Sequence, residues 1–492
     1  MFSARYNTQT CVNFSPKRKQ NALCSVIKRI IYYICVKYSR KKMLIRFVIE
    51  NMFSFGERKE FTTIPNKRLK TLLDHQYNIN GFEILKLSSI YGANGAGKSN
   101  LIKSLFQFQK LVTREEIPFR LKETLHKFVN KKEQILAIEF IQDKTPLYYG
   151  IVLSEDKIIT EELYLSGLGK KEDQLIFERK TVGDKTNIKF LDAFESDEKS
   201  QVLKTVLLEE FVKATEPVLK LLANRDNKYL KDVKKAYQWF SETLEIITPD
   251  SKPSALAHKI DVDIEFKKYA EDLMCSFNIG IKSLETEKKN IQEFFGEDND
   301  NELDKLIKTV EDSPKKMIGL TSRRGDEIIL VKEQDTIWVK TLKVEHSSSS
   351  NSAFFDLDEE SDGTVRLLDF VPAFKQVISS AKVYLIDEIE RSIHPLLIKE
   401  LVKKFSLDNK TLGQLIFTTH ESNLLDQDIF RQDEIWFAEK DLNGSTDLYS
   451  LSDFKEHKTI DIRKGYLNGR YGSIPFLGNL EDLNWHDYDF NE

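Results

Sequence analysis

The stretch of sequence that decides the fold reads Gly92-Ala93-Asn94-Gly95-Ala96-Gly97-Lys98-Ser99, and it follows an apolar run from Ile84 to Tyr91. It fits the phosphate-loop pattern G-x-x-x-x-G-K-[ST] in every fixed position. The glycines allow backbone N–H groups to turn inward on phosphates. We expect Lys98 to reach the β and γ oxygens of ATP and the Ser99 hydroxyl to ligate Mg²⁺. From Asn100 onward the spacing is helical, so residues 92–100 are predicted to bind ATP between a strand and a helix.

Two adjacent carboxylates end a second apolar run. The run Val383–Ile386 is followed directly by Asp387 and Glu388. A buried parallel strand would deliver Asp387 to the Mg²⁺ shell, and Glu388 would then orient or deprotonate the attacking water. An apolar run that ends in Asp-Glu is common by itself, and a strand end with solvated acids is the alternative interpretation. The phosphate loop upstream favours the catalytic interpretation.

The turn Ser361-Asp362-Gly363-Thr364 precedes an apolar stretch that is a predicted helix, Val365–Phe370. A small hydroxyl, a glycine and a helix N-terminus together make an anion site. A plain helix cap is the alternative. The turn lies between the phosphate loop and the Asp-Glu strand in the sequence, and this order predicts that it donates to the γ-phosphate held by a second subunit. On this interpretation a side chain at Gly363 would push into that phosphate.

A histidine follows a third strand-like run, Gln414–Thr418, with one residue between them. We expect His420 to lie at the γ-phosphate of bound ATP, and we predict that it acts in catalysis together with Glu388 and Lys98. His394 lies in Ser-Ile-His-Pro shortly after the Asp-Glu pair and is expected at an interface rather than in catalysis. No glutamine is assigned to water positioning; the candidates are Gln107, Gln109 and Gln142.

The composition is that of a soluble globular chain. Of 492 residues, 40% are hydrophobic and 31% are charged. The hydrophobic share is enough to bury a sizeable core, and the composition is not that of a disordered chain. The four cysteines are scattered, so we expect no disulfide scaffold and a reducing, cytoplasmic location. The apolar run Ala22–Val36 is interrupted by Lys28 and Arg29 and is too short to span a bilayer, so no membrane is expected as a partner.

The first 42 residues differ from the rest. They contain ten Lys and Arg and no Asp or Glu, and since the whole chain has a net charge of −4, residues 43–492 carry −14. Residues 1–42 are therefore either a basic arm for nucleic acid or an anionic surface, or a leader upstream of a true start at Met43. The second interpretation is favoured because a strand-like run begins at once after Met43. Residues 481–492 form an acidic tail.

The remaining sequence divides into two lobes and an insertion. Residues 43–194 hold the phosphate loop and three strand-like runs in an antiparallel meander, Ile135–Ile141, Leu147–Leu153 and Ile158–Leu165. Residues 195–315 are charged and helix-favouring and are predicted to be a helical insertion broken by prolines. Residues 316–480 resume with strands at Glu327–Val331 and Thr336–Val344 and carry the signature turn, the Asp-Glu strand and His420.

Several motifs carry a family resemblance: Ile49–Phe55, Gly92–Ser99, Glu360–Thr364, Ile386–Glu390 with Ile393–Pro395, Thr418–His420 and Gly469–Phe476. With them the chain resembles the ABC-type ATPases of bacterial phage-defence and abortive-infection loci, relatives of the OLD and RecF/SMC ATPases with an AAA domain. The likeness spans about Met43 to Leu477. It implies an α/β fold: an ABC/SMC-type P-loop NTPase head with an antiparallel β subdomain and an inserted helical subdomain.

The resemblance also implies partners. These are a second copy of the chain, with two ATP molecules sandwiched between the subunits, and a separate effector such as a nuclease. OLD nucleases append a TOPRIM domain after the ATPase, but only 105 residues follow Asp387 here, and these are needed for the core. We therefore expect that this chain does not cut nucleic acid itself.

Alternative functions follow from the same motifs. A RecF/SMC-like repair ATPase that binds DNA is the main alternative; the charge of −14 on residues 43–492 weakens it, although a local basic groove would be enough for DNA. A transporter ATPase is disfavoured by the large insertion and by a signature turn that lacks the Leu-Ser-Gly-Gly-Gln form. A regulatory GTPase is disfavoured because no Asn-Lys-x-Asp guanine-binding motif occurs.

Overall fold

The computed structural model describes residues 41–114, 123–253, 255–296, 300–321, 327–347, 351–454, 456–457 and 460–474. The predictions made for most of the N-terminal extension (1–40 of 1–42), for the acidic tail 481–492 and for the last two residues of the motif 469–476 lie outside the described residues. No helix among the described residues is both long enough and apolar enough to cross a membrane.

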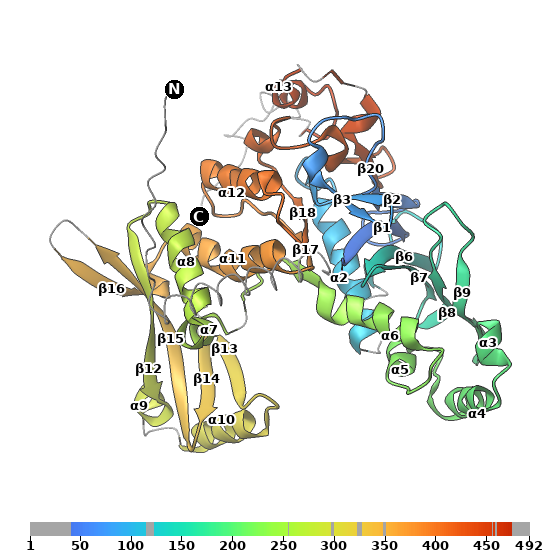
Figure 1. The fold of residues 1–492 in the computed structure, drawn as a ribbon, viewed down its shortest axis with the longest axis horizontal. Coiled ribbons are helices and arrows are strands. Elements are labelled where there is room, and N and C mark those ends of the chain that lie inside the picture. Colours follow the sequence, from blue (N-terminus) through green and yellow to red (C-terminus); the bar gives the residue numbers. More distant parts are fainter. Residues whose placement is uncertain are drawn as a thin grey trace, which may run out of the picture. The chain divides into compact units, whose positions relative to one another are not determined.

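The central sheet has six strands in the order β11-β17-β18-β5-β19-β20. Five of them run parallel, and β20 closes the sheet as an antiparallel edge. The bounds are β5 Leu87–Tyr91, β11 Leu244–Ile247, β17 Val383–Ile386, β18 Gln414–Thr418, β19 Ile435–Lys440 and β20 Thr446–Ser450. The strand before the phosphate loop (β5) and the strand before Asp387 (β17) are thus separated by β18, whose end leads to His420 (Figure 1).

Helices cover both faces of this sheet. Successive side chains of a strand point to opposite faces, so Ile416 of β18 packs in one hydrophobic core and its neighbours Leu415 and Phe417 pack in another. The first core includes α2 (Lys98–Arg114); the second includes α11 (Asp362–Ser379) and α12 (Pro395–Leu407). Burial on both faces explains why these parallel strands are continuous apolar runs in the sequence.

A seven-stranded antiparallel sheet has the order β10-β9-β8-β7-β6-β1-β2 and shares the first core with α2. Its bounds are β1 Met43–Glu50, β2 Lys59–Thr62, β6 Glu133–Gln142, β7 Thr145–Ser154, β8 Lys157–Leu165, β9 Gln174–Val182 and β10 Lys185–Phe190. The predicted meander is β6–β8 and is confirmed; β9 and β10 extend it. The predicted run Ile84–Tyr91 is divided between β5 and a small hairpin, β3 (Gln76–Ile79) and β4 (Phe82–Leu85).

The expected helical insertion contains helices but is not purely helical. Its helices are α4 Glu198–Val206, α5 Leu219–Ala223, α6 Lys231–Gln238, α7 Leu256–Val262, α8 Ile264–Ser276, α9 Ile291–Phe295 and α10 Asp300–Asp312, preceded by α3 Asp192–Glu195. Two strands interrupt them. One is β11, which joins the central sheet beside β17, and the other is β12 (Ile281–Asn290). The domain boundaries at 194, 315 and 480 therefore remain proposals.

The second of these strands belongs to a five-stranded antiparallel sheet. Its order is β12-β15-β14-β13, and β16 pairs with β15. The bounds are β13 Met317–Thr321, β14 Glu327–Glu333, β15 Thr336–Ser347 and β16 Ser352–Asp356; α7 packs against β12, β14 and β15, and α8 against β12 (Figure 1). The predicted strands at 327–331 and 336–344 are confirmed as β14 and β15. Short helical turns and α13 (Ile462–Leu467) complete the described chain.

Candidate nucleotide site

The predicted site residues meet at one edge of the central sheet. Strands β5, β18 and β17 are parallel neighbours, so their carboxyl ends lie at the same edge. There β5 leads into the loop 92–97 and α2, β17 leads into Asp387 and Glu388, and β18 leads into His420. Ligands of open α/β sheets bind at this edge. The topology therefore brings together residues that are about 300 positions apart in the sequence.

Lys98 is folded back on its own loop. Its Nζ donates to the carbonyl oxygens of Gly92 (2.8 Å) and Ala93 (3.1 Å) and lies 3.3 Å from Nδ1 of His420. Burial lowers the pKa of Lys98 to about 8, although the carboxylates of Glu390 and its neighbours act in the opposite direction. Among the described residues it forms no ion pair. The ammonium is thus held by two carbonyls of its own loop and by the His420 ring, without an ion pair.

Oxygen ligands suited to a divalent cation converge beside it. The Ser99 hydroxyl donates to Oδ1 of Asp387 at 3.0 Å, and the Thr418 hydroxyl donates to the same oxygen at 2.6 Å. Asp387 is buried, and its backbone N–H is held by the Ile247 carbonyl at the end of β11. A hydroxyl next to a buried carboxylate is the oxygen chemistry that Mg²⁺ prefers, so Ser99 and Asp387 fit this ion.

Glu388 has a left-handed backbone conformation, with φ of 50°. For a residue other than glycine this conformation costs on the order of 1–3 kcal/mol and persists only where the surroundings enforce it. Here the Glu388 N–H donates to the Thr418 hydroxyl at 2.8 Å, so Thr418 holds both Asp387 and the backbone of Glu388. The sharp turn leaves the Glu388 side chain half-buried at the strand end. Sequence reasoning gave Thr418 no role of its own.

His420 lies between the phosphate loop and the segment after β17. Its backbone N–H donates to Oε1 of Glu390 at 2.5 Å, and its ring faces Lys98. Burial lowers the pKa of His420, and the charge of Lys98 lowers it further. The imidazole is therefore neutral near pH 7, with a ring nitrogen able to accept a hydrogen bond.

The signature turn is a helix cap in this structure. Ser361 is the N-cap of α11: its hydroxyl accepts the Thr364 N–H at 3.2 Å and lies 2.9 Å from the Thr364 hydroxyl. Within the described chain, none of the residues 361–364 hydrogen-bonds to Lys98, Ser99 or Asp387. The structure brings Lys98, Ser99, Asp387, Glu388 and His420 together and leaves this turn outside their hydrogen bonds.

The reason for a glycine at 363 differs from the expected one. A Cβ placed on Gly363 would stand 2.6 Å from the carbonyl oxygen of Ser392 in the same chain, which is closer than such atoms approach. The turn is thus pressed against the segment that follows Glu388. A side chain at Gly363 would therefore strain its own backbone, and its contact with a partner's phosphate stays a prediction.

Two residues brace the phosphate loop that the motif does not include. The Thr446 hydroxyl lies 2.8 Å from the Ala96 carbonyl oxygen and 2.7 Å from the Ser54 hydroxyl, which also accepts the Asn100 side-chain N–H at 2.9 Å. Gly97 has φ of 108°, and Thr446 and Ser54 fill the space in which a Cβ would stand. Ser54 lies within the opening motif Ile49–Phe55, whereas no local signal points to Thr446.

Two of the three candidate glutamines, Gln109 and Gln142, have other partners. The Gln109 amide donates to the carbonyls of Phe240 and Leu244 at 2.8 Å each, and Gln142 accepts the Thr243 hydroxyl at 3.1 Å. These bonds fix the start of β11, and they give Gln109 and Gln142 a structural task.

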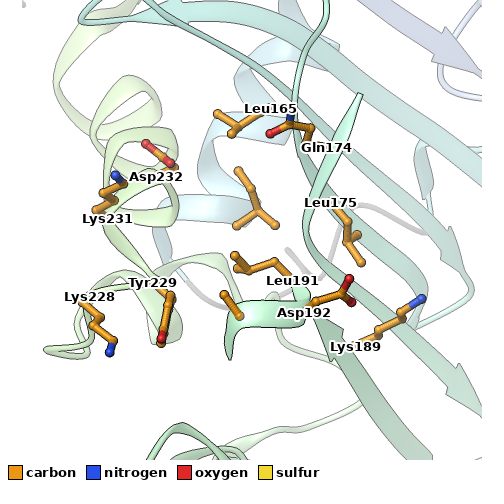
Figure 2. A pocket seen from close by; sticks show the side chains of 12 residues that line it. Leu165, Gln174, Leu175, Lys189, Leu191, Asp192, Lys228, Tyr229, Lys231 and Asp232 are labelled. Carbon is orange, nitrogen blue, oxygen red and sulfur yellow. The ribbon is translucent and has the colours of Figure 1, made fainter. Parts of the chain in front are cut away.

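A cavity of about 780 Å³ lies away from these residues, between the ends of β8, β9 and β10 and the helices α3 and α6 (Figure 2). Apolar side chains such as Leu191 line it, and charged side chains stand at its rim (Figure 2). Two of the rim charges are neutralised, since Lys228 pairs with Asp197 at 3.4 Å and Asp232 with Lys235 at 2.8 Å. None of the predicted site residues lines this cavity.

Fold and site together define a P-loop nucleotide-binding domain, with a phosphate loop, Asp387 and His420 at the carboxyl edge of a mainly parallel sheet. Residues 87–426 match the family described as "AAA domain, putative AbiEii toxin, Type IV TA system". This match covers more than two thirds of the chain, and the protein belongs to this AAA family. Among curated proteins no sequence matches it.

Solved structures of SMC heads are similar at low identity. One is an SMC head bound to the C-winged helix domain of ScpA (10% identity, TM-score 0.39, covering 84% of this chain and 99% of that chain). A second is the SMC head domain from Thermotoga maritima (11%, 0.34, 83% and 98%). A third is the SMC head domain with an extended coiled coil bound to the C-terminal domain of ScpA from Pyrococcus furiosus (13%, 0.38, 87% and 100%).

Proposed function

We propose that this protein binds ATP with Mg²⁺ and hydrolyses it. The observation that carries the proposal is the convergence of Lys98, Asp387 and His420 at the carboxyl ends of three parallel strands. A chance glycine-rich turn would not place its lysine beside a histidine from one strand end and its serine beside an aspartate from another.

Each residue then has a definite task. Lys98 exchanges the carbonyls of residues 92 and 93 for β and γ oxygens, and loop N–H groups hold the remaining phosphate charge. Ser99 and Asp387 hold Mg²⁺, which neutralises charge on the β- and γ-phosphates when bound. Glu388 orients the attacking water or takes its proton, and the neutral ring of His420 lies at the γ-phosphate end.

We further propose that two copies form an ATP-gated homodimer in which residues 361–364 of each copy complete the site of the other. Two observations support this. The turn is not hydrogen-bonded to its own site within the described chain, and the surface beside it is hollowed by about 760 Å³. Arg366 and Arg391 line this hollow beside the N-terminus of α11, together with Lys252 and the carboxylates of Asp358, Glu360, Asp362 and Asp369.

The biological role that we propose is that of a cytoplasmic sensor and regulator ATPase of an anti-phage defence system, which controls a separate effector such as a nuclease. The family description supports this, since it names an AbiEii toxin and a type IV toxin–antitoxin system. Plaque assays on cells that carry the whole locus test it. Protection should be lost with Lys98→Ala, and equal protection by the variant would contradict the role. ATPase activity stimulated by DNA alone would favour the repair function.

The enzymatic proposal is tested with Glu388→Gln. This variant should bind ATP as the wild type does but hydrolyse it at least about 100-fold more slowly, because water activation is lost. Light scattering with ATP and Mg²⁺ should then detect a stable dimer that is absent without nucleotide. A variant that hydrolyses at the wild-type rate contradicts the assignment of Glu388. One that stays monomeric contradicts the ATP-gated dimer.

Completion of the site in trans is tested with Asp362→Trp rather than at Gly363, because any side chain at Gly363 strains its own chain. Asp362 is exposed in the hollow, so a large side chain there blocks a partner without disturbing the core. Asp362→Trp and Lys98→Ala should each be inactive. On mixing, one composite site per mixed dimer carries neither lesion, and ATPase activity should partly return. No recovery in proven mixed dimers would contradict completion in trans.

A further inference from the structure

Glu390 is a carboxylate of the site without a task in the reaction proposed above. It follows Glu388 by two residues, and its Oε1 accepts the backbone N–H of His420 at 2.5 Å. Its Oε2 is buried and makes no hydrogen bond of normal geometry among the described residues, although the Thr419 hydroxyl lies near the carboxylate. Burial raises the pKa of Glu390, so the fold holds this group there at a cost.

The hydrogen bond that Glu390 accepts holds the backbone of His420. The preceding residue, Thr419, is still held by the neighbouring strand, since its N–H donates to the Ile90 carbonyl at 3.0 Å. Beyond that point β18 has ended, and the hydrogen bond to Glu390 is the one that the structure gives to the His420 N–H. The imidazole then faces Lys98 at 3.3 Å. The backbone position of His420 therefore depends on a side chain from the neighbouring strand end, while the ring itself contacts Lys98 and the backbone of Gly92.

The backbone around Glu390 is itself tightly determined. The Arg391 N–H donates to the Glu388 carbonyl at 3.0 Å and the Ile393 N–H to the Glu390 carbonyl at 2.9 Å. Glu388 and Ser392 have positive φ of 50° and 62°, so two sharp bends enclose Glu390. A carboxylate on so rigid a segment can hold its partner in one place.

We propose that Glu390 is a positioning residue that holds His420 toward the γ-phosphate end of the site through the His420 backbone N–H. This inference rests on the proposed ATP hydrolysis and adds to it the device that aligns the histidine. It separates two steps: binding of ATP relies on Lys98 and the loop, whereas the rate of hydrolysis relies on the bond between Glu390 and His420.

The test compares four variants by kcat and by ATP Kd: Glu390→Ala, Glu390→Gln, His420→Ala, and the double variant with alanine at both positions. Glu390→Ala should lower kcat about 10- to 100-fold with the Kd within threefold, since misplacement of a catalytic group slows chemistry without removing ATP contacts. Glu390→Gln keeps an oxygen acceptor and should recover most of the rate. The double variant should be no slower than His420→Ala alone, because both changes remove one unit.

Glu421 provides a matched control. It is the next residue after His420, and its carboxylate also accepts a backbone N–H, that of Asn423 at 2.8 Å. Glu421→Ala should hydrolyse ATP at the wild-type rate, which separates the effect of Glu390 from a general need for carboxylates beside the histidine.

Several results would overturn the inference. Multiplicative losses in the double variant would show that Glu390 acts apart from His420. A Glu390→Gln variant as slow as Glu390→Ala would show that charge matters rather than hydrogen-bond acceptance. If Glu390→Ala does not fold, Glu390→Gln and the double variant Glu390→Gln/His420→Ala replace it. The test is again whether the double variant is slower than His420→Ala alone. A wild-type protein without ATPase activity would refute the proposed function itself, whereas an impaired His420→Ala beside an unimpaired Glu390→Ala refutes this inference alone.

Discussion

Of the three buried lysines in the described part of the chain, Lys86, Lys98 and Lys340, the last two are treated in opposite ways. Lys340 lies on β15 in the five-stranded sheet, where its Nζ donates to Asp261 and Glu333 at 2.5 Å each and lies 3.3 Å from Nδ1 of His258. Burial alone would lower the pKa of Lys340, but the hydrogen bonds to both carboxylates outweigh it and raise the pKa. Its charge is thus neutralised where it stands.

Lys98 at the central sheet has no such partner. It is held by two carbonyls of its own loop, and burial lowers its pKa to about 8. A buried cation without an ion pair costs stability, and the fold bears this cost at Lys98 while avoiding it at Lys340. Lys86, held by the Asp408 carbonyl at the start of β5, has a pKa lowered by burial too, so an anion is expected at Lys98 because it also lies at the carboxyl edge of the central sheet.

The five-stranded sheet around Lys340 and the central sheet around Lys98 also differ in backbone strain. In the five-stranded sheet Gln334 has a positive φ of 54°, but it lies in the two-residue turn between β14 and β15, where this conformation is ordinary. At the central sheet Glu388 has a positive φ of 50° directly after the buried strand β17. Glu388 therefore has strain that a hairpin does not require, and it lies at the proposed catalytic edge.

The largest effect is expected from removing the uncompensated charge. Lys98→Ala should weaken ATP binding at least about 100-fold, which corresponds to about 2.7 kcal/mol, because the phosphates lose their main cation. Its thermal stability should be equal or higher. Calorimetric titration and thermal unfolding measure both quantities. Lys103→Ala, an exposed lysine on the same helix, is the control and should bind ATP normally. ATP affinity within a few-fold of wild type for Lys98→Ala would contradict the site.

The opposite pattern is expected from Lys340→Met. Asp261 and Glu333 then lose their shared cation, and the free energy of unfolding should fall by about 1–2 kcal/mol, since both acids are about one third exposed and water compensates in part. ATP affinity should not change. Lys305→Met, at an exposed position of α10, is the control for thermal unfolding. Weaker ATP binding without loss of stability would reverse the comparison.

The sequence predicted the part of the fold that local pattern encodes. Buried parallel strands are apolar runs, so β5, β17 and β18 were found, and so were the meander strands β6–β8. Strand β12 was missed because only Ile281 and Leu284 of its ten residues are buried, and its Lys- and Glu-rich composition favours helix. Its charges form cross-strand pairs such as Lys282 with Glu345 of β15, a pattern that is visible only once the pairing is known. Strand β11 is as short as β17, but no motif follows it as Asp387-Glu388 follows β17, so it was not predicted.

The site shows the same limit. Lys98, Asp387 and His420 follow from motifs whose spacing fixes their chemistry. Thr418 and Glu390 lie within motifs that carry the resemblance, but they received no role because they act through bonds to residues of another strand end. The contact that explains Gly363 likewise depends on tertiary packing. The sequence therefore predicts the side chains that would contact ATP. It does not predict the side chains that hold those residues in place.

A smaller effect follows from pH. The pKa of Lys98 is lowered from 10.5 to about 8, so between these values the unfolded chain binds more protons there and the free energy of unfolding should rise with pH. The destabilising contribution of Lys98 is complete below pH 8. The advantage of Lys98→Met over wild type should therefore shrink by on the order of 1–2 kcal/mol from pH 8 to pH 10. Lys340, whose pKa is raised, loses its contribution only above its ordinary value of 10.5. Denaturant unfolding at four pH values measures the difference, and a constant advantage would contradict the unpaired state of Lys98.

The smallest effect is expected from divalent ions at the second lysine. His258, Asp261 and Glu333 bring three ligand atoms within 4.8 Å of one another, which is close enough to hold a metal ion. The ammonium of Lys340 already contacts all three groups, so Zn²⁺ would have to displace a cation that hydrogen-bonds more than one of them. Added Zn²⁺ should therefore change the Tm of the wild type by no more than about 1 °C, whereas chelation of Mg²⁺ should stop ATP hydrolysis at the central sheet.

Lys340→Met removes the ammonium from the three ligand groups, and Zn²⁺ should then raise the Tm of this variant by a few degrees. Adding His258→Ala to that variant should abolish the rise, because imidazole is the strongest zinc ligand of the three. A wild type stabilised by Zn²⁺ through His258 would mean that the ammonium of Lys340 does not fill its cluster, and the contrast between a compensated and an uncompensated lysine would fail.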